Sequence, residues 1–173
     1  MRDQVFLCSS QAPADEPWRQ RLRVMLQPLV RQGALRLWDR TSVPTGARWE
    51  EEIELALARA RVALVLVSAD LLAADDLAER ELPVLLRAAE AGTLRLLWVP
   101  VRASLHQWSQ FAPYQPVHPP ERPLAELSAA EQDQALVKIA EEVQRAFAEG
   151  LQPLARRRVV RVSTFTPSSR SRS

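Results

Sequence analysis

The side chains of this chain that are best placed for chemistry follow an apolar run at residues 62–67. Ser68 ends the run, and Glu81 lies on the helix that is predicted to come next. In an open α/β sheet the ligand lies beyond the carboxyl ends of the strands. A hydroxyl at a strand end and a carboxylate on the following helix therefore indicate a candidate ligand site.

The other reactive side chains do not form a familiar site. His106 and His118 lie in a proline-rich segment with no cysteine or carboxylate at metal-ligand spacing, so we expect no metal site. Cys8 is the only cysteine, which excludes an internal disulfide, and its apolar neighbours favour a buried position. The sequence contains neither Gly-x-Gly-x-x-Gly nor a Gly-Lys-Ser/Thr loop. We therefore expect no tightly held cofactor.

The elements that must position Ser68 and Glu81 alternate between strand and helix. Apolar runs predict strands at residues 5–8, 34–38, 62–67 and 94–99, and a short edge strand at 124–127. Amphipathic spacing predicts helices at residues 18–32, 49–60 (with Trp49 on the apolar stripe), between Ser68 and Gly92, and 129–147.

Local signals refine two of these helices. Asp76 and Glu79 have the spacing of a capping box, and Pro83 should bend the same helix just past Glu81 because it cannot donate a backbone hydrogen bond. Ser128 with Glu131 predicts a second capping box at the start of the last helix.

This alternation predicts an α/β fold. The expected architecture is flavodoxin-like, with three αβα layers and a five-stranded parallel sheet in the order 2-1-3-4-5. In that order the switch point lies between strands 1 and 3. Ser9, Ser10, Ser68 and Glu81 should then surround one crevice.

Length and charge limit the classes of protein that are compatible with the chain. Its 173 residues suit one domain, which we place at residues 1–149, followed by a basic, Ser/Arg-rich flexible tail or linker at 150–173. The net charge is +2, and the six arginines after Ala155 leave about −4 for the rest, which argues against a nucleic-acid-binding body. No apolar run is long enough for a membrane span, and the N-terminus does not read as a signal peptide. These features predict a soluble, cytoplasmic protein.

Four segments follow one another in order at residues 5–10, 38–40 with 44–46, 63–68 with 81–83, and 97–101 with Trp108. They resemble the boxes of TIR (Toll/interleukin-1 receptor) domains of the bacterial type. The resemblance covers about residues 3–148 and implies the TIR fold. Two positions depart from the family pattern: Cys8-Ser9-Ser10 stands where a Ser-Tyr pair is common, and Leu77 stands where many members have an aromatic residue, four positions before the glutamate.

The resemblance implies an NAD+ glycohydrolase with Glu81 as the catalytic group. Nicotinamide leaves the ribose as a neutral ring, so no general acid has to protonate it. A fixed carboxylate stabilises the oxocarbenium-like charge on the ribose more than it stabilises the ground state. NAD+ is then a substrate, and no cofactor is implied. The implied substrate-binding positions are Ser9, Ser10, Trp38, Arg40, Ser68 and Leu77.

The segment at residues 39–47 is similar to the family's loop that contacts a neighbouring copy. Asp39, Pro44 and Gly46 are its candidate assembly residues. The implied partners are NAD+ and further copies of the chain, with activity arising on self-assembly. Such domains commonly act as effectors in bacterial defence or signalling systems. The product is left open between ADP-ribose and a cyclic isomer.

Alternatives remain open for the function and for the residues. The functional alternatives are a non-catalytic TIR adaptor module that recruits partners through the same loop, and chemistry like that of nucleoside 2-deoxyribosyltransferases. For the residues, the alternatives are a solvated Glu81, a strand-end cap at Ser68, loop-forming roles for Ser9 and Ser10, a core position for Trp38, and a surface pair of Arg40 with Asp39.

Overall fold

The computed structural model describes residues 2–149, so the predicted tail at 150–173 lies outside the described residues. Its centre is a parallel sheet of four strands in the order β2-β1-β3-β4. The first four positions of the predicted strand order 2-1-3-4-5 are therefore confirmed, with β1 and β3 adjacent at the switch point. The strands are β1 (Gln4–Cys8), β2 (Arg36–Trp38), β3 (Ala60–Val67) and β4 (Arg95–Pro100).

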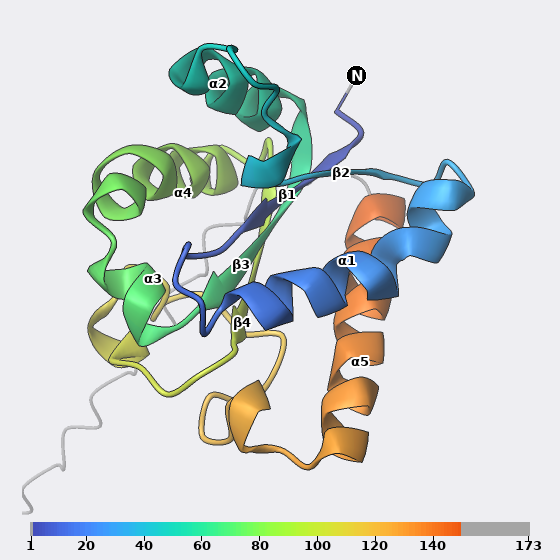
Figure 1. Ribbon diagram of the computed structural model, residues 1–173, viewed down its shortest axis with the longest axis vertical. Coiled ribbons are helices and arrows are strands. Elements are labelled where there is room, and N and C mark those ends of the chain that lie inside the picture. The colour runs from blue at the N-terminus through green and yellow to red at the C-terminus, as the bar shows by residue number, and fades with distance from the viewer. Residues whose placement is uncertain (1, 150–173) are drawn as a thin grey trace, which may run out of the picture.

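Helices cover both faces of this sheet, as the predicted αβα layering requires (Figure 1). Helices α1 and α5 pack on one face, and α2, α3 and α4 pack on the other. The two central strands alternate between the two hydrophobic clusters, so Val5 and Leu7 point to one face while Phe6 and Cys8 point to the other. The helices are α1 (Glu16–Arg31), α2 (Trp49–Arg59), α3 (Ala69–Ala73), α4 (Leu82–Glu90) and α5 (Ala129–Ala148).

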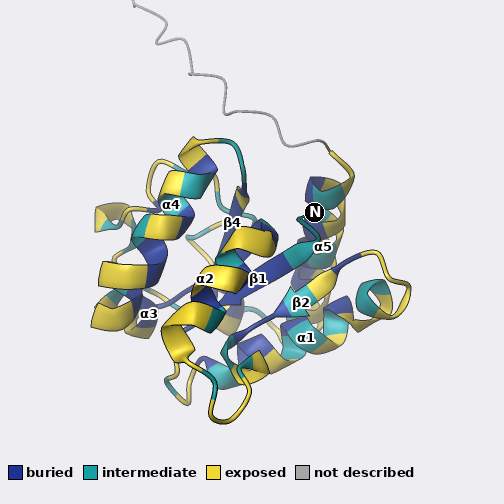
Figure 2. Ribbon diagram, turned by 90° about the horizontal axis from the view of Figure 1, so that it is seen from above, coloured by how far each residue is buried: buried dark blue, intermediate teal, exposed yellow. Residues whose placement is uncertain are grey.

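Burial follows this layering. Figure 2 shows β1 dark blue between helices whose outer faces are exposed. Strand β3 is buried along almost its whole length, which explains why its sequence reads as a continuous apolar run and not as an alternation. The capping box of Ser128 and Glu131 is present at the start of α5, as predicted.

The predicted edge strand at residues 124–127 is wrong. Leu124–Glu126 forms a single 3-10 turn whose Leu124 side chain is buried in the core. Pro123 has no N–H to donate, and the backbone N–H of Ala125 donates to the carbonyl of Val101 at 2.9 Å. One such bond ties the turn to the end of β4 but does not build a fifth strand.

The segment after Ser68 is two helices joined by an irregular turn, and not the one bent helix that the sequence predicts. Leu77–Glu81 forms a π-helical turn, in which the N–H of Leu82 donates to the carbonyl of Leu77 five residues earlier. Pro83 follows at the start of α4, and a proline both lacks the N–H and clashes with a regular preceding turn, which the wider turn relieves. The turn ends at Glu81.

The predicted capping box at Asp76 and Glu79 is also wrong, because the Asp76 side chain accepts no cap hydrogen bond. The helix that follows β3 starts earlier, at Ala69, and Ser68 caps it by accepting a hydrogen bond from the N–H of Leu71 at 3.1 Å. Ser68 thus has a capping role at the end of β3, as its alternative interpretation proposed, and the element that it caps is α3.

Candidate functional site

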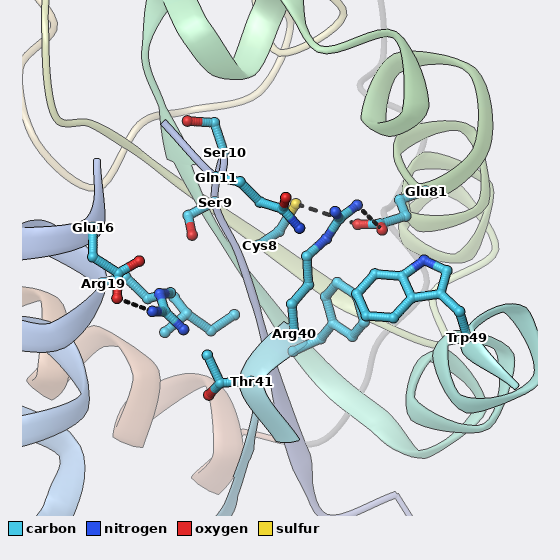
Figure 3. Close-up of a pocket in the computed structure, with 12 residues that line it drawn as sticks. Cys8, Ser9, Ser10, Gln11, Glu16, Arg19, Arg40, Thr41, Trp49 and Glu81 are labelled. Atoms are coloured by element: carbon cyan, nitrogen blue, oxygen red, sulfur yellow. Dashed lines mark hydrogen bonds and ion pairs between the residues drawn. The ribbon is translucent and has the colours of Figure 1, made fainter. Parts of the chain in front are cut away.

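A pocket of about 230 Å³ opens at the carboxyl end of β1 (Figure 3). The loop after β1, the start of α1, the turn after β2, the start of α2 and the π-helical turn all contribute side chains to it. The lining residues are Phe6, Leu7, Cys8, Ser9, Ser10, Gln11, Glu16, Arg19, Arg40, Thr41, Trp49 and Glu81.

Glu81 is the buried acid of this pocket, and its side chain is 5% exposed. Arg40 Nη2 donates to its Oε1 at 2.5 Å, and the Cys8 thiol lies 3.9 Å from its Oε2. Burial raises the pKa of Glu81 above its ordinary value, and the nearby Arg40 offsets only part of that effect. A poorly hydrated carboxylate interacts strongly with any positive charge that enters the pocket.

Arg40 reaches Glu81 because of the local structure after β2. Asp39 caps a 3-10 turn over Arg40–Ser42, and this turn directs the Arg40 side chain away from its sequence neighbour. Figure 3 shows the side chain passing the Trp49 indole on its way to Glu81. The guanidinium carbon lies 5.0 Å from the centroid of the Trp49 ring. The alternative of a surface pair between Arg40 and Asp39 is therefore wrong.

Asp39, the first residue of the predicted assembly loop, is fully buried. Its carboxylate accepts hydrogen bonds from the N–H of Thr41 at 2.8 Å and from Arg23 at 2.5 Å, and Arg19 lies 3.4 Å away. Burial alone would raise the pKa of Asp39, but the hydrogen bonds from Thr41 and Arg23 and the charge of Arg23 bring it below its ordinary value. Asp39 therefore anchors the base of the loop.

The two other predicted assembly residues lie further along and are exposed. Pro44 and Gly46 belong to a turn in which the N–H of Ala47 donates to the carbonyl of Pro44 at 3.1 Å. Gly46 has a φ of 84°, a conformation that other residues rarely adopt. This part of the loop is free to meet another surface, whereas Asp39 is not.

Of the predicted serines, Ser9 and Ser10 line the pocket and Ser68 does not. The hydroxyls of Ser10 and Ser68 both donate to the carboxylate of Asp15, the latter at 2.5 Å. Arg102 Nε donates to the other oxygen of Asp15 at 2.9 Å. This fully buried acid joins the ends of β1, β3 and β4.

Trp38 and Leu77, also predicted to bind substrate, lie outside the pocket lining. Trp38 stacks on Phe6 with ring centroids 4.7 Å apart and is buried in the core, as its alternative interpretation proposed. Leu77 is buried under the π-helical turn among the core residues of the same face. Neither side chain reaches the space in front of Glu81.

The sequence interpretation missed Asp15 and Trp49. Asp15 immediately precedes α1, where an acid is most simply explained as a helix cap, yet its side chain makes no cap hydrogen bond. Trp49 fits the apolar stripe of α2 by spacing, but it is the first residue of the helix, 38% exposed, and it lines the pocket. The position of each residue at the end of an element was the signal available.

Residues 2–149 contain no candidate metal site and no helix suited to crossing a membrane. No group of three or more His, Cys, Asp or Glu side chains in this range could hold a metal ion. His106 packs near Trp98, and the Nε2 of His118 lies 2.6 Å from the carbonyl of Arg122. None of the helices in this range combines the length and apolar character needed to cross a bilayer.

Comparison with known proteins identifies the family of the chain. None of the curated proteins matches the chain. The family model described as TIR domain matches residues 5–138, which include β2, β3, β4, all of β1 except its first residue, and the pocket lining. With this match over most of its length and the expected parallel sheet between two layers of helices, the chain belongs to the TIR domain family.

Proposed function

We propose that this TIR domain hydrolyses NAD+ at the bond between nicotinamide and ribose. The observation that carries the proposal is the buried Glu81 carboxylate, which lines a pocket at the carboxyl end of the sheet and is the last residue of an irregular π-helical turn. Irregular π-helical turns of this kind occur frequently at functional sites.

The reaction requires little more than this acid. The bond between ribose C1′ and the ring nitrogen breaks, and its electron pair stays with the nitrogen, so the cationic ring leaves as neutral nicotinamide. Positive charge develops on the ribose and is stabilised by Glu81 in a setting of low polarity. Water then attacks C1′ and loses a proton to give ADP-ribose. Glycosidases need a second acid for their leaving group, and this reaction does not.

The size of the pocket supports a role for self-assembly in this activity. A volume of about 230 Å³ lies below the range of roughly 300–1,000 Å³ that is typical of ligand sites, and a dinucleotide needs more room. Only part of NAD+ can therefore lie in the pocket, and the remainder must extend beyond it. The exposed turn at Pro44 and Gly46 stands close in sequence to Arg40 and offers the surface by which a second copy completes the site.

A non-catalytic adaptor is the second candidate, and the ion pair of Arg40 with Glu81 favours it. In the isolated chain this pair engages the acid on which the hydrolysis depends. An adaptor uses the same exposed loop for association and leaves the pocket unused.

The two candidates are separated by incubating concentrated or crowded protein with NAD+ and measuring free nicotinamide. We expect release from the wild-type chain, none from Glu81→Gln, and full release from Glu79→Gln, a matched control on the exposed side of the same turn. Equal release from Glu81→Gln would overturn the assignment of Glu81. Absence of release from every assembled sample, combined with loss of self-association in Pro44→His, would establish the adaptor.

2-Deoxynucleosides in the same assay test the remaining alternative. Release of a base from these substrates, without release of nicotinamide from NAD+, would identify chemistry of the deoxyribosyltransferase kind. We expect none, because the buried Glu81 carboxylate and the Trp49 indole favour a ring that carries a positive charge before the bond breaks, and a deoxynucleoside has no such charge.

A further inference from the structure

The Arg40 guanidinium occupies the space between the two most distinctive groups of the pocket. One edge donates to Glu81 at 2.5 Å, and one face lies 5.0 Å from the centroid of the Trp49 ring. All three side chains line the pocket (Figure 3). An indole face and a carboxylate thus hold a flat, positively charged group that belongs to the protein itself.

A site of this composition recognises planar cations as a class. Tryptophan is the best aromatic partner for a cation, and the attraction is stronger where water is excluded. The buried carboxylate supplies the opposite charge. A guanidinium meets both requirements because it is planar and its charge is delocalised. An aromatic ring with a permanent positive charge, such as an N-alkylated pyridinium, meets the same requirements.

The Arg40 guanidinium does not have all of its hydrogen bonds satisfied in this position. Its Nε is buried and has no hydrogen-bond partner within the described residues 2–149. A buried donor without a hydrogen-bond partner is unfavourable, so it offsets part of the free energy that the ion pair with Glu81 contributes. The side chain is still 20% exposed, and the residues that follow it in the loop, Thr41 and Ser42, are exposed. Arg40 can therefore leave its position toward water without unpacking the core.

Two other buried carboxylates near the pocket differ in this respect. Asp39 is held by Arg23 and Thr41, and Asp15 is held by Arg102, Ser10 and Ser68. Neither carboxylate is among the residues that line the pocket. The lining also contains the pair of Glu16 with Arg19, but the Glu16 side chain is 47% exposed, whereas Glu81 is buried and its arginine also packs on the Trp49 indole.

We infer that Arg40 is an internal competitor, which fills a planar-cation seat between Trp49 and Glu81 and must be displaced before a charged aromatic ring can enter. The seat discriminates by charge, so a cationic pyridinium enters and a neutral ring of the same shape does not. This deepens the proposed function, since it concerns the ring of the substrate that approaches Glu81. The apparent affinity for such a ring is lowered by the fraction of molecules in which Arg40 is bound.

Binding of 1-methylnicotinamide tests the inference without any chemistry. This probe carries the permanent ring charge but has no ribose to be cleaved, and neutral nicotinamide is its matched control. We expect Arg40→Ala to bind the cation about tenfold more tightly than the wild-type chain, with neutral nicotinamide unaffected. Arg48→Ala, at an exposed arginine in the same loop, should leave both affinities unchanged.

Two further measurements keep the result independent of folding. Adding Trp49→Leu to Arg40→Ala should remove the gain in affinity for 1-methylnicotinamide. Guanidinium at low millimolar concentration, far below denaturing levels, should compete with 1-methylnicotinamide in Arg40→Ala, whereas sodium chloride at the same ionic strength should compete less. Retained far-UV circular dichroism and a cooperative melt in each variant confirm that the site is intact, and Arg40→Gln serves if Arg40→Ala does not fold.

The outcomes separate this inference from the proposed function. If Arg40→Ala and Arg40→Gln bind 1-methylnicotinamide no more tightly than the wild-type chain, Arg40 is not a competitor. This holds even if the wild-type chain releases nicotinamide from NAD+. Equal binding of the charged and neutral rings would overturn the inference as well. Tighter, charge-selective binding supports the seat, even if no assembled sample hydrolyses NAD+.

Discussion

Two carboxylate–arginine pairs of the same length lie next to each other in this fold and differ in their consequences. Asp39 pairs with Arg23 and Glu81 pairs with Arg40, each at 2.5 Å, and both carboxylates are buried. The pKa of Asp39 lies below its ordinary value, and that of Glu81 lies above. An arginine beside a buried carboxylate therefore does not by itself decide which form of the acid is favoured.

The other hydrogen-bond donors to each carboxylate decide whether its pKa is raised or lowered. Asp39 also accepts from the N–H and the hydroxyl of Thr41, so directed hydrogen bonds replace the water that burial removes. Among residues 2–149, Glu81 accepts, besides Arg40, only from the Cys8 thiol at 3.9 Å, which is a weak donor. Asp39 is thereby a structural anchor, whereas Glu81 keeps unsatisfied capacity that a ligand can use.

The largest expected effect is the loss of stability when the Asp39 carboxylate, which anchors the loop, is neutralised. Asp39→Asn removes the negative charge but leaves Arg23 and Arg19 directed at the site, so we expect the free energy of unfolding to fall by about 3 kcal/mol. Chemical denaturation monitored by circular dichroism measures it. Glu50→Gln, in an exposed pair with Arg80, is the control and should change stability by about 0.5 kcal/mol or less. A loss as small as the control's would show that Asp39 is no anchor.

Glu81→Gln should have a smaller effect on stability than Asp39→Asn, although the proposed activity depends on Glu81. Neutralising this acid removes a charge that burial disfavours, and Arg40 can turn toward water. We expect a change within about 1 kcal/mol at neutral pH, measured in the same denaturation experiment. If the loss equals that of Asp39→Asn, the two carboxylates have the same structural role and the contrast between them is wrong.

The two acids should also give stability of opposite pH dependence. The pKa of Asp39 is lowered on folding, so its contribution is complete above the ordinary aspartate pKa of 3.8 and is lost as the pH falls further. The pKa of Glu81 is raised, so the folded chain binds the extra proton and loses stability as the pH rises above the ordinary value of 4.5.

Unfolding curves of the wild-type chain, Asp39→Asn and Glu81→Gln between about pH 3 and pH 8 resolve these contributions. The difference between wild type and Asp39→Asn should shrink toward the acid end. Relative to Glu81→Gln, the wild-type chain should lose stability as the pH increases through the raised pKa of Glu81. Parallel curves for the wild-type chain and Glu81→Gln would show that the pKa of Glu81 is not raised by folding.

The fold could be predicted from the sequence to a larger extent than the contacts of the site. Strand and helix periodicity, with the segments that resemble TIR boxes, predicted the parallel sheet and the position of Glu81 at its carboxyl end. The predicted fifth strand at residues 124–127 failed because an apolar run reports burial, and Leu124 is buried in a turn. The single helix after Ser68 failed because Pro83 forces a wider turn before it.

The partners of the charged side chains could not be predicted in the same way. Arg40 follows Asp39 in the chain but pairs with Glu81, which is 41 positions away. Periodicity indicates which face of an element is buried and carries no information on which side chain lies opposite. Asp15 and Trp49 were missed for this reason, since their roles depend on residues from three other elements or from the loop before α2.

The smallest effect concerns Cys8, the only cysteine of the chain, which reports on Glu81 from inside the pocket. Burial raises the pKa of its thiol, and the charge of Glu81 raises it further, so the unreactive protonated form dominates at neutral pH. In Glu81→Gln the second cause disappears and the first, larger one remains. We therefore expect alkylation of the folded chain by iodoacetamide to stay far slower than in denaturant and to quicken by less than about tenfold in this variant. Glu79→Gln, at an exposed position two residues earlier in the same turn, should leave the alkylation rate unchanged. An unchanged rate in Glu81→Gln would mean that the carboxylate charge is already neutralised in the wild-type chain. Glu81 would then resemble Asp39 in being fully compensated by its partners.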